Sequence, residues 1–226
     1  VAGGIILQIL KERGVYIGAH ISKISTICDK LYDPCHVSPQ DLKAISGKEL
    51  PVLDSEAERA MSELILAQKS TGNSIGGVIE CAVIGMPAGI GAPIFDGLEN
   101  RISQCVFGIP AIKGIEFGAG FDVAEMTGAE NNDDFYFDTD GSIKTATNNH
   151  GGILGGISSG MPLIFRVAVK PTPSIGLEQS SVCIPSKENT KLTVKGRHDP
   201  CILPRAVPCV EAAAAIAIYD MICDNI

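Results

Sequence analysis

The sequence predicts an α+β fold in a single domain that covers residues 1–226. Helical and extended segments alternate singly along the chain, yet glycine turns and short hairpins dominate late in the sequence. A doubly wound parallel sheet is typically marked by a GxGxxG turn after its first strand, and none is present. With 226 residues, 45% of them hydrophobic, the chain can build one core of ordinary size.

The N-terminal quarter predicts a helix, a strand and a loop. Apolar residues recur at helical spacing over Val1–Arg13, and Gly14 follows as a stop signal. Period-two alternation then predicts a strand over Val15–Ile24. His20 falls on the polar face of this strand, where we expect a solvated or hydrogen-bonded histidine. The segment Thr26–Val52 is polar and irregular, which indicates a loop with at most a short helix.

The middle of the chain predicts alternating helices and strands. Ser55 and Glu58 form a capping-box pattern at the start of a helix that runs to about Ser70. We then expect a strand, a helix and a strand at Ser74–Ile84, Leu98–Phe107 and Ile112–Phe117. The segment Asn131–Asp140 is acidic but lacks the spacing and terminal glutamate of an EF-hand, so we expect a mobile acidic loop.

The stretch Asn148–Ile175 has three parts with different physical properties. Gly151–Gly160 is glycine-rich, and glycine lets backbone N–H groups approach a ligand closely. Leu163–Lys170 alternates as a strand with one apolar face. In Lys170–Ser174 two prolines hold the backbone extended, and a lysine and two hydroxyls there suit an anionic or polar cofactor. The alternative is a glycine-rich connection followed by an edge strand.

The last fifty residues predict a hairpin and a buried helix. Ser181–Ile184 and Lys191–Val194 are its strands, around a turn at Pro185–Asn189. Pro208 stands where a helix could begin, and Ala212–Ile222 is apolar almost all round, as in a buried helix.

The tripeptide Arg197-His198-Asp199 places a fixed cation, a titratable ring and a carboxylate side by side. In an extended segment Arg197 and Asp199 share a face, where they could bind an anion and transfer a proton. The alternative is a structural ion pair.

Composition excludes several classes of function. A net charge of −8 argues against a general nucleic-acid or anionic-membrane surface. No apolar run suggests a transmembrane segment, and Val1–Leu10 lacks the charged region of a signal peptide. Eight cysteines without a CxxC pair indicate reduced thiols in a cytoplasmic protein. We expect no metal site, because the spacing of Cys28, Cys35 and His36 matches no common zinc pattern.

Several long strings occur in an order that closely resembles chorismate synthases. They are GGILGGISSG, KPTPSI, GRHDPC, SIGGVIECAVIGMPAGIGAPIFDGLENRI and AIKGIEFGAGFDVA, and the resemblance covers essentially the whole chain. It implies helices sandwiched between antiparallel β-sheets and a homotetramer. It also implies a lyase that uses reduced FMN for the anti-1,4-elimination of phosphate from 5-enolpyruvylshikimate 3-phosphate, giving chorismate. Whether NADPH reduces the flavin in the same protein stays open.

The resemblance also implies roles for particular residues. Asp199 would be the catalytic acid/base beside the flavin N5. The flavin-binding residues would be Pro110, Ala111, Gly155, Lys170, Pro171, Thr172, Pro173, Ser174 and Arg197. Pro110 stands where the family often has asparagine, so a side-chain contact is lost there.

The family's N-terminal motifs are absent from this sequence. They include Gly-Glu-Ser-His-Gly, a second histidine motif and Gly-Arg-Ser-Ser-Ala-Arg, and His20, His36 and His150 are not expected to replace them. We therefore expect the C-terminal two-thirds of a chorismate synthase, truncated at the N-terminus and inactive as a fragment. The alternative is a catalytically incomplete flavin-binding or oligomerisation module.

Overall fold

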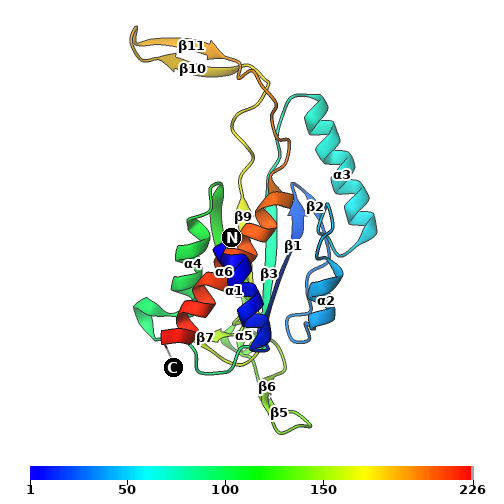
Figure 1. The fold of residues 1–226 in the computed structure, drawn as a ribbon, viewed down its shortest axis with the longest axis vertical. Coiled ribbons are helices and arrows are strands. Elements are labelled where there is room, and N and C mark those ends of the chain that lie inside the picture. The colour runs from blue at the N-terminus through cyan, green and yellow to red at the C-terminus, as the bar shows by residue number, and fades with distance from the viewer. Residues whose placement is uncertain (225–226) are drawn as a thin grey trace.

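A five-stranded antiparallel sheet forms the centre of the computed structural model, which describes residues 1–224 (Figure 1). Its strand order is β2-β1-β3-β9-β4, so β9 is hydrogen-bonded on both sides. The strands are β1 (Tyr16–Ile24), β2 (Ile27–Cys28), β3 (Gly77–Ile84), β4 (Ile112–Phe117) and β9 (Leu163–Val169). The predicted α+β class with antiparallel pairing is confirmed.

Helices cover one face of this sheet and enclose the main core. Helix α6 (Leu203–Asp224) packs against α1 (Ala2–Glu12), α4 (Leu98–Phe107), β1 and β3. Alternate residues of β9 point into this core, as predicted, and Phe165 and Val167 are fully buried. On the other face a smaller cluster includes Leu42 of α2 (Pro39–Ala44), while α3 (Ser55–Ser70) lies beside β2.

Three short hairpins leave the central sheet. They are β5 (Phe135–Phe137) with β6 (Ile143–Thr145), β7 (Ile153–Leu154) with β8 (Ile157–Ser158), and β10 (Gln179–Cys183) with β11 (Glu188–Leu192). The β5–β6 and β10–β11 hairpins project at opposite ends of the long axis (Figure 1). The remaining short elements are the 3₁₀ helices η1 (Ile94–Asp96) and η2 (Gly120–Glu125) and helix α5 (Gly128–Asn131).

The capping box predicted at Ser55 is wrong. The N-cap of α3 is Asp54, whose carboxylate accepts a hydrogen bond of 2.8 Å from the Glu56 N–H, so Ser55 is already helical. A reciprocal capping box does occur earlier, between Ser38 and Asp41 at the start of α2. The predicted loop over residues 26–52 therefore contains both β2 and α2.

The structure corrects three further expectations. Strand β9 is an interior strand, so the edge-strand alternative is wrong. The segment Asn131–Asp140 is not simply an acidic loop, because β5 pairs with β6 and Asp133 is buried beneath Thr147. Helix α6 begins at Leu203, five residues before Pro208, which lies inside it.

Helix α6 is also long and apolar enough, by length and composition, to cross a membrane. No such segment was expected from the sequence. Half of its most apolar 18-residue stretch is buried within the structure. A core helix of a soluble protein can be equally long and apolar. This helix is therefore only a weak indication of a membrane span.

The crossing of α1 and α6 leads to a prediction with an internal control. A Cβ atom added at Gly3 would overlap Ala212 of α6, whereas one added at Gly4 would meet nothing within 4 Å. We expect Gly3→Ala to lower the free energy of unfolding by about 1–3 kcal/mol through overpacking. Gly4→Ala should raise it by up to about 1 kcal/mol, because alanine favours the helix. Equal effects in denaturant unfolding would contradict this packing.

Candidate functional site

Two of the predicted flavin-binding segments meet where β9 ends. The Lys170 N–H, directly after β9, donates a hydrogen bond of 2.9 Å to the carbonyl oxygen of Ala111. Ala111 lies in the turn before β4 and has a φ of 76°, in the left-handed region that few residues other than glycine adopt. Such strained residues concentrate at ligand sites. Pro110, its neighbour in this turn, is exposed.

Residues 74–77 connect a third predicted region, the segment around Asp199, with the Lys170–Ser174 segment. The Ser74 hydroxyl donates to the Thr172 carbonyl oxygen at 2.6 Å, and the Ile75 N–H donates to the Pro200 carbonyl oxygen at 2.8 Å. Gly76 allows this crowding, since a Cβ atom there would overlap the backbone around Pro171. The Lys170–Ser174 segment and the segment around Asp199 therefore both contact residues 74–77.

Asp199 is held at the base of α6. Its side chain is only 24% exposed, and one carboxylate oxygen forms an ion pair with Arg205, in the first turn of α6. The other oxygen accepts from the Cys201 N–H at 3.3 Å. His198 bonds the Val194 carbonyl oxygen through Nε2 at 2.7 Å, which places a proton on Nε2. Arg197 is exposed to solvent.

The residues present are compatible with a polar cofactor. A groove of about 480 Å³ runs beside Pro171 and Val169 and along residues 74–78. The Thr172 hydroxyl is buried yet has no hydrogen-bond partner among residues 1–224. A buried hydroxyl normally has a partner, so this one suits a ligand atom that the chain itself does not supply.

Gly155 does not join this group. It lies in the β7–β8 turn with a φ of 60°, and a Cβ atom there would meet nothing within 4 Å. The space around it fits close approach of a ligand, as the sequence implied. However, β7 and β8 precede β9, whereas Lys170 follows it, so the whole of β9, seven residues and about 23 Å of extended chain, lies between them along the sequence.

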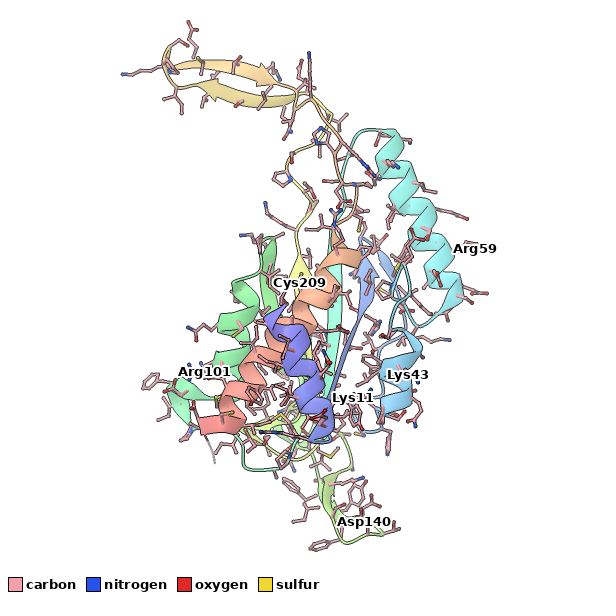
Figure 2. All side chains as sticks on the ribbon, in the orientation of Figure 1. Lys11, Lys43, Arg59, Arg101, Asp140 and Cys209 are labelled. Carbon is pink, nitrogen blue, oxygen red and sulfur yellow. The ribbon has the colours of Figure 1, made fainter. Side chains whose placement is uncertain are left out.

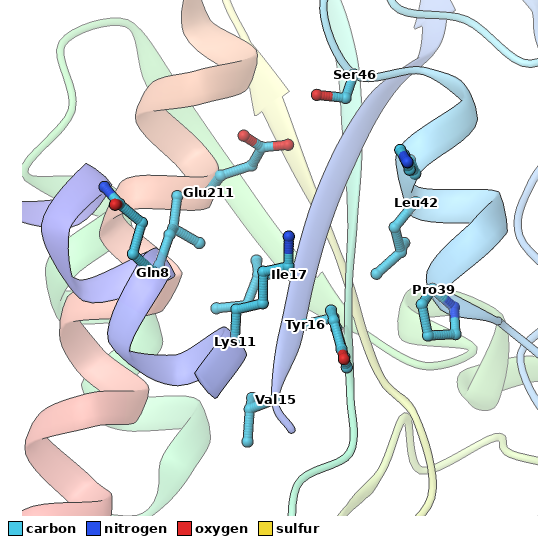
Figure 3. A pocket seen from close by; sticks show the side chains of 11 residues that line it. Gln8, Lys11, Val15, Tyr16, Ile17, Pro39, Leu42, Ser46 and Glu211 are labelled. Atoms are coloured by element: carbon cyan, nitrogen blue, oxygen red, sulfur yellow. The ribbon is translucent and has the colours of Figure 1, made fainter. Parts of the chain in front are cut away.

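A larger cavity lies elsewhere, between α1, β1 and α2 (Figure 3). It measures about 490 Å³, and none of the predicted site residues lines it. Glu211 points into this region and accepts a hydrogen bond of 2.9 Å from the Ala19 N–H. Burial raises the pKa of Glu211. In residues 1–224 no group of His, Cys, Asp and Glu side chains is arranged to hold a metal ion.

Sequence reasoning missed a row of charged side chains across four strands. His20, Glu80, Arg166 and Glu116 are register partners on β1, β3, β9 and β4. The His20 ring bonds Glu80 at 3.0 Å through Nε2 and Asp29 at 3.2 Å through Nδ1. Arg166 donates from Nε to Glu116 at 2.6 Å. The signal available in the sequence was a single charged residue within each of two otherwise apolar strands, Glu80 and Arg166.

Burial and pairing act in opposite directions on this row. Burial alone would lower the pKa of His20, but hydrogen bonds to Asp29 and Glu80 outweigh it and the pKa is raised. Burial alone would raise the pKa of Asp29, but bonds from His20 and from the Leu53 and Asp54 N–H groups lower it. A carboxylate oxygen faces each ring nitrogen, and ionised carboxylates only accept hydrogen bonds, so this geometry places a protonated His20 between them. The predicted solvated alternative is wrong, and the hydrogen-bonded one is confirmed.

Comparisons with known proteins identify the family of this chain. The sequence profile of the family described as "Chorismate synthase" matches residues 1–223. This chain belongs to the chorismate synthase family.

Relatives in this family come from several organisms. A chorismate synthase of Lancefieldella parvula is 49% identical over 97% of this chain and 60% of its own length. One of Methanothermobacter thermautotrophicus is 42% identical over 97% of this chain and 58% of its own length. A crystal structure of chorismate synthase matches with a TM-score of 0.79 and 28% identity, over 99% of this chain and 61% of that one. The chain thus spans about three fifths of these chorismate synthases.

The buried His20 leads to a stability prediction for this chorismate synthase family member. We expect His20→Leu to lower the free energy of unfolding by about 3–5 kcal/mol, because two buried carboxylates lose their cation. His36→Leu is the control, since that ring is 73% exposed and should change stability by less than about 0.5 kcal/mol. Urea unfolding at pH 6 measures both, and equal effects would contradict the arrangement.

The pH dependence follows from the direction of the His20 shift. A group whose pKa is raised on folding stabilises the folded state fully below its unfolded value of 6.5. This contribution is lost as the pH rises through the raised pKa. The stability difference between wild type and His20→Leu should therefore shrink in alkaline buffer, and a difference that grows with pH would exclude a protonated His20.

Proposed function

We propose that the whole protein is a chorismate synthase, a lyase that eliminates phosphate from 5-enolpyruvylshikimate 3-phosphate to give chorismate. The observation that carries this proposal is a chain of contacts: Ala111 bonds Lys170, and residues 74–77 bond both the Lys170–Ser174 segment and the segment around Asp199. These segments hold the matching motifs, and they are far apart in the sequence. Family membership supports the same reaction.

Reduced FMN would bind along the Lys170–Ser174 segment. The lysine provides a cation, Thr172 and Ser174 provide hydroxyls, and the prolines limit the entropy lost on binding. Ala111 and Arg197 would add a backbone contact and a second cation, and Pro110 would contact the flavin only through its backbone and ring. Gly155, which lies before β9, is not assigned a contact with the flavin held by this segment. Reduced flavin supplies electron density to the allylic system during C–O cleavage, without net redox change.

Asp199 would transfer a proton beside the flavin N5. Its partial burial and its ion pair with Arg205 hold the carboxylate in one orientation at the start of α6. An oriented carboxylate near the reacting atoms is suited to general acid–base catalysis. The trianionic substrate needs several cations, and Arg197, Lys170 and Arg205 supply only part of them.

The same resemblance supports a homotetramer in the cytoplasm, with no nucleic acid, membrane or metal ion involved. The alternative function is a flavin-binding or oligomerisation module that is catalytically incomplete. It is favoured by the missing N-terminal histidine motifs in residues 1–226. Activity measurements separate the two proposals.

The decisive assay is anaerobic turnover of 5-enolpyruvylshikimate 3-phosphate with dithionite-reduced FMN, followed by chorismate absorbance. We expect turnover by the full-length protein and none by residues 1–226 alone. FMN binding without turnover in both would favour the incomplete module. Neither binding nor turnover in either would overturn both proposals.

Asp199 is tested in the same assay. We expect Asp199→Asn to reduce kcat by about 10²–10⁴-fold, the range for loss of a general acid or base. The control is Asp122→Asn, an exposed position in η2, which should keep wild-type kcat. A kcat for Asp199→Asn within twofold of wild type would exclude the proton-transfer role.

The unpartnered hydroxyl of Thr172 tests the cofactor site separately. If it bonds the flavin, Thr172→Val should weaken FMN binding by about 2–10-fold, which corresponds to one hydrogen bond. Thr190→Val on the exposed strand β11 is the control and should leave the Kd unchanged. Anaerobic calorimetric titration measures both. An unchanged Kd for Thr172→Val, with a more stable protein, would show that the hydroxyl contacts no ligand.

A further inference from the structure

Two projecting segments expose apolar side chains that a stable monomer would normally bury. The first is the arm, defined as residues 177–197, which carries the β10–β11 hairpin away from the body of the molecule (Figure 1). Its exposed apolar residues are Leu177, Val182, Ile184 and Leu192, and Ile184 is 81% exposed. Both strands of the arm pair only with each other.

The second is the tip, defined as residues 128–145, which carries the β5–β6 hairpin at the opposite end of the long axis (Figures 1 and 2). Three consecutive aromatic residues, Phe135, Tyr136 and Phe137, are exposed, and so is Ile143. Phe137 is 77% exposed. Contiguous exposed apolar groups of this kind mark interaction surfaces.

The charges of the two segments are complementary. The arm contains four basic residues, Lys187, Lys191, Lys195 and Arg197, and two acidic ones. The tip contains five acidic residues, Glu130, Asp133, Asp134, Asp138 and Asp140, and one basic one. A basic apolar surface and an acidic aromatic surface therefore occur on the same chain, at opposite ends.

We propose that the arm of one copy docks on the tip of a second copy. An antiparallel, two-fold related pair brings each arm to the other copy's tip, so one dimer contains two identical contacts. The apolar residues supply the buried area, and the opposite charges set the orientation. This deepens the proposed self-association by naming its surfaces, and it does not depend on the proposed reaction.

The partner's chemistry follows from the two surfaces together. A nucleic acid or an anionic membrane would repel the acidic tip, although it could attract the arm. A second copy satisfies both segments at once. The reach of the arm beyond the body also favours a contact outside its own chain (Figure 1).

Two charge-reversed forms of the full-length protein test this contact. The first carries Lys187→Glu and Lys191→Glu in the arm, and the second carries Asp134→Lys, Asp138→Lys and Asp140→Lys in the tip. In the first, arm and tip are both acidic, and in the second both are basic. We expect each alone to self-associate at least about 10-fold more weakly than wild type in sedimentation velocity.

Mixing the two forms decides between a contact within one chain and a contact between copies. In a mixed pair every arm meets a tip of opposite charge, so the mixture should recover the wild-type mass. Recovery also shows that both variants are folded. The control is Arg59→Glu with Lys69→Glu on α3, an exposed pair away from both segments, which should keep the wild-type mass.

Three results would overturn the proposal. They are a wild-type protein that sediments as one chain, reversed forms that keep the wild-type mass, and a mixture that fails to recover it. If circular dichroism shows that a reversed form is misfolded, the single changes Ile184→Ser and Phe137→Ser replace it. Each should weaken self-association in the same way. Turnover of the wild-type protein is measured alongside, so a failure of this contact is distinguished from a failure of the proposed reaction.

Discussion

The pairing of β9 with strands on both sides determines where the candidate site can form. Val169, its last residue, is in register with Gly77 of β3 and with Ile112 of β4. The last residue of β9 therefore lies beside the first residues of β3 and β4. This brings the residues that adjoin these strand ends, Lys170, Ala111 and residues 74–77, together. Gly77 permits the close packing, because a Cβ atom there would overlap the backbone of Lys23 on β1.

The same registers give the sheet two different faces. One face places Phe165 and its neighbours under α6, where burial of apolar area stabilises the fold. The other aligns His20, Glu80, Arg166 and Glu116 into a row of alternating charge. Buried charges are costly unless they are paired, so this row constrains the register strongly: a slip of one residue would leave carboxylates without cations.

Different contacts hold the two parts of the candidate site in place. The Lys170–Ser174 segment continues from an interior strand and is held by Ser74. Asp199 is instead held by Arg205 and by the start of α6. The two projecting hairpins form separate two-stranded sheets in the described residues, outside the central sheet. Apolar residues on such hairpins contribute little to the fold of one copy, which is why an intermolecular role explains them better.

The sequence by itself determined the α+β class, the bounds of the helix Leu98–Phe107 and the strand Ile112–Phe117, and the alternation of β9. These depend on local periodicity or on strings of adjacent residues, which one sequence displays directly. Only the tertiary structure decided that β9 is interior, that His20 is a buried cation, and that Gly155 lies apart from Lys170. Those features depend on which strands pair and on what covers each face. That pairing joins residues up to about ninety positions apart, as with Glu80 and Arg166, and no local pattern records it.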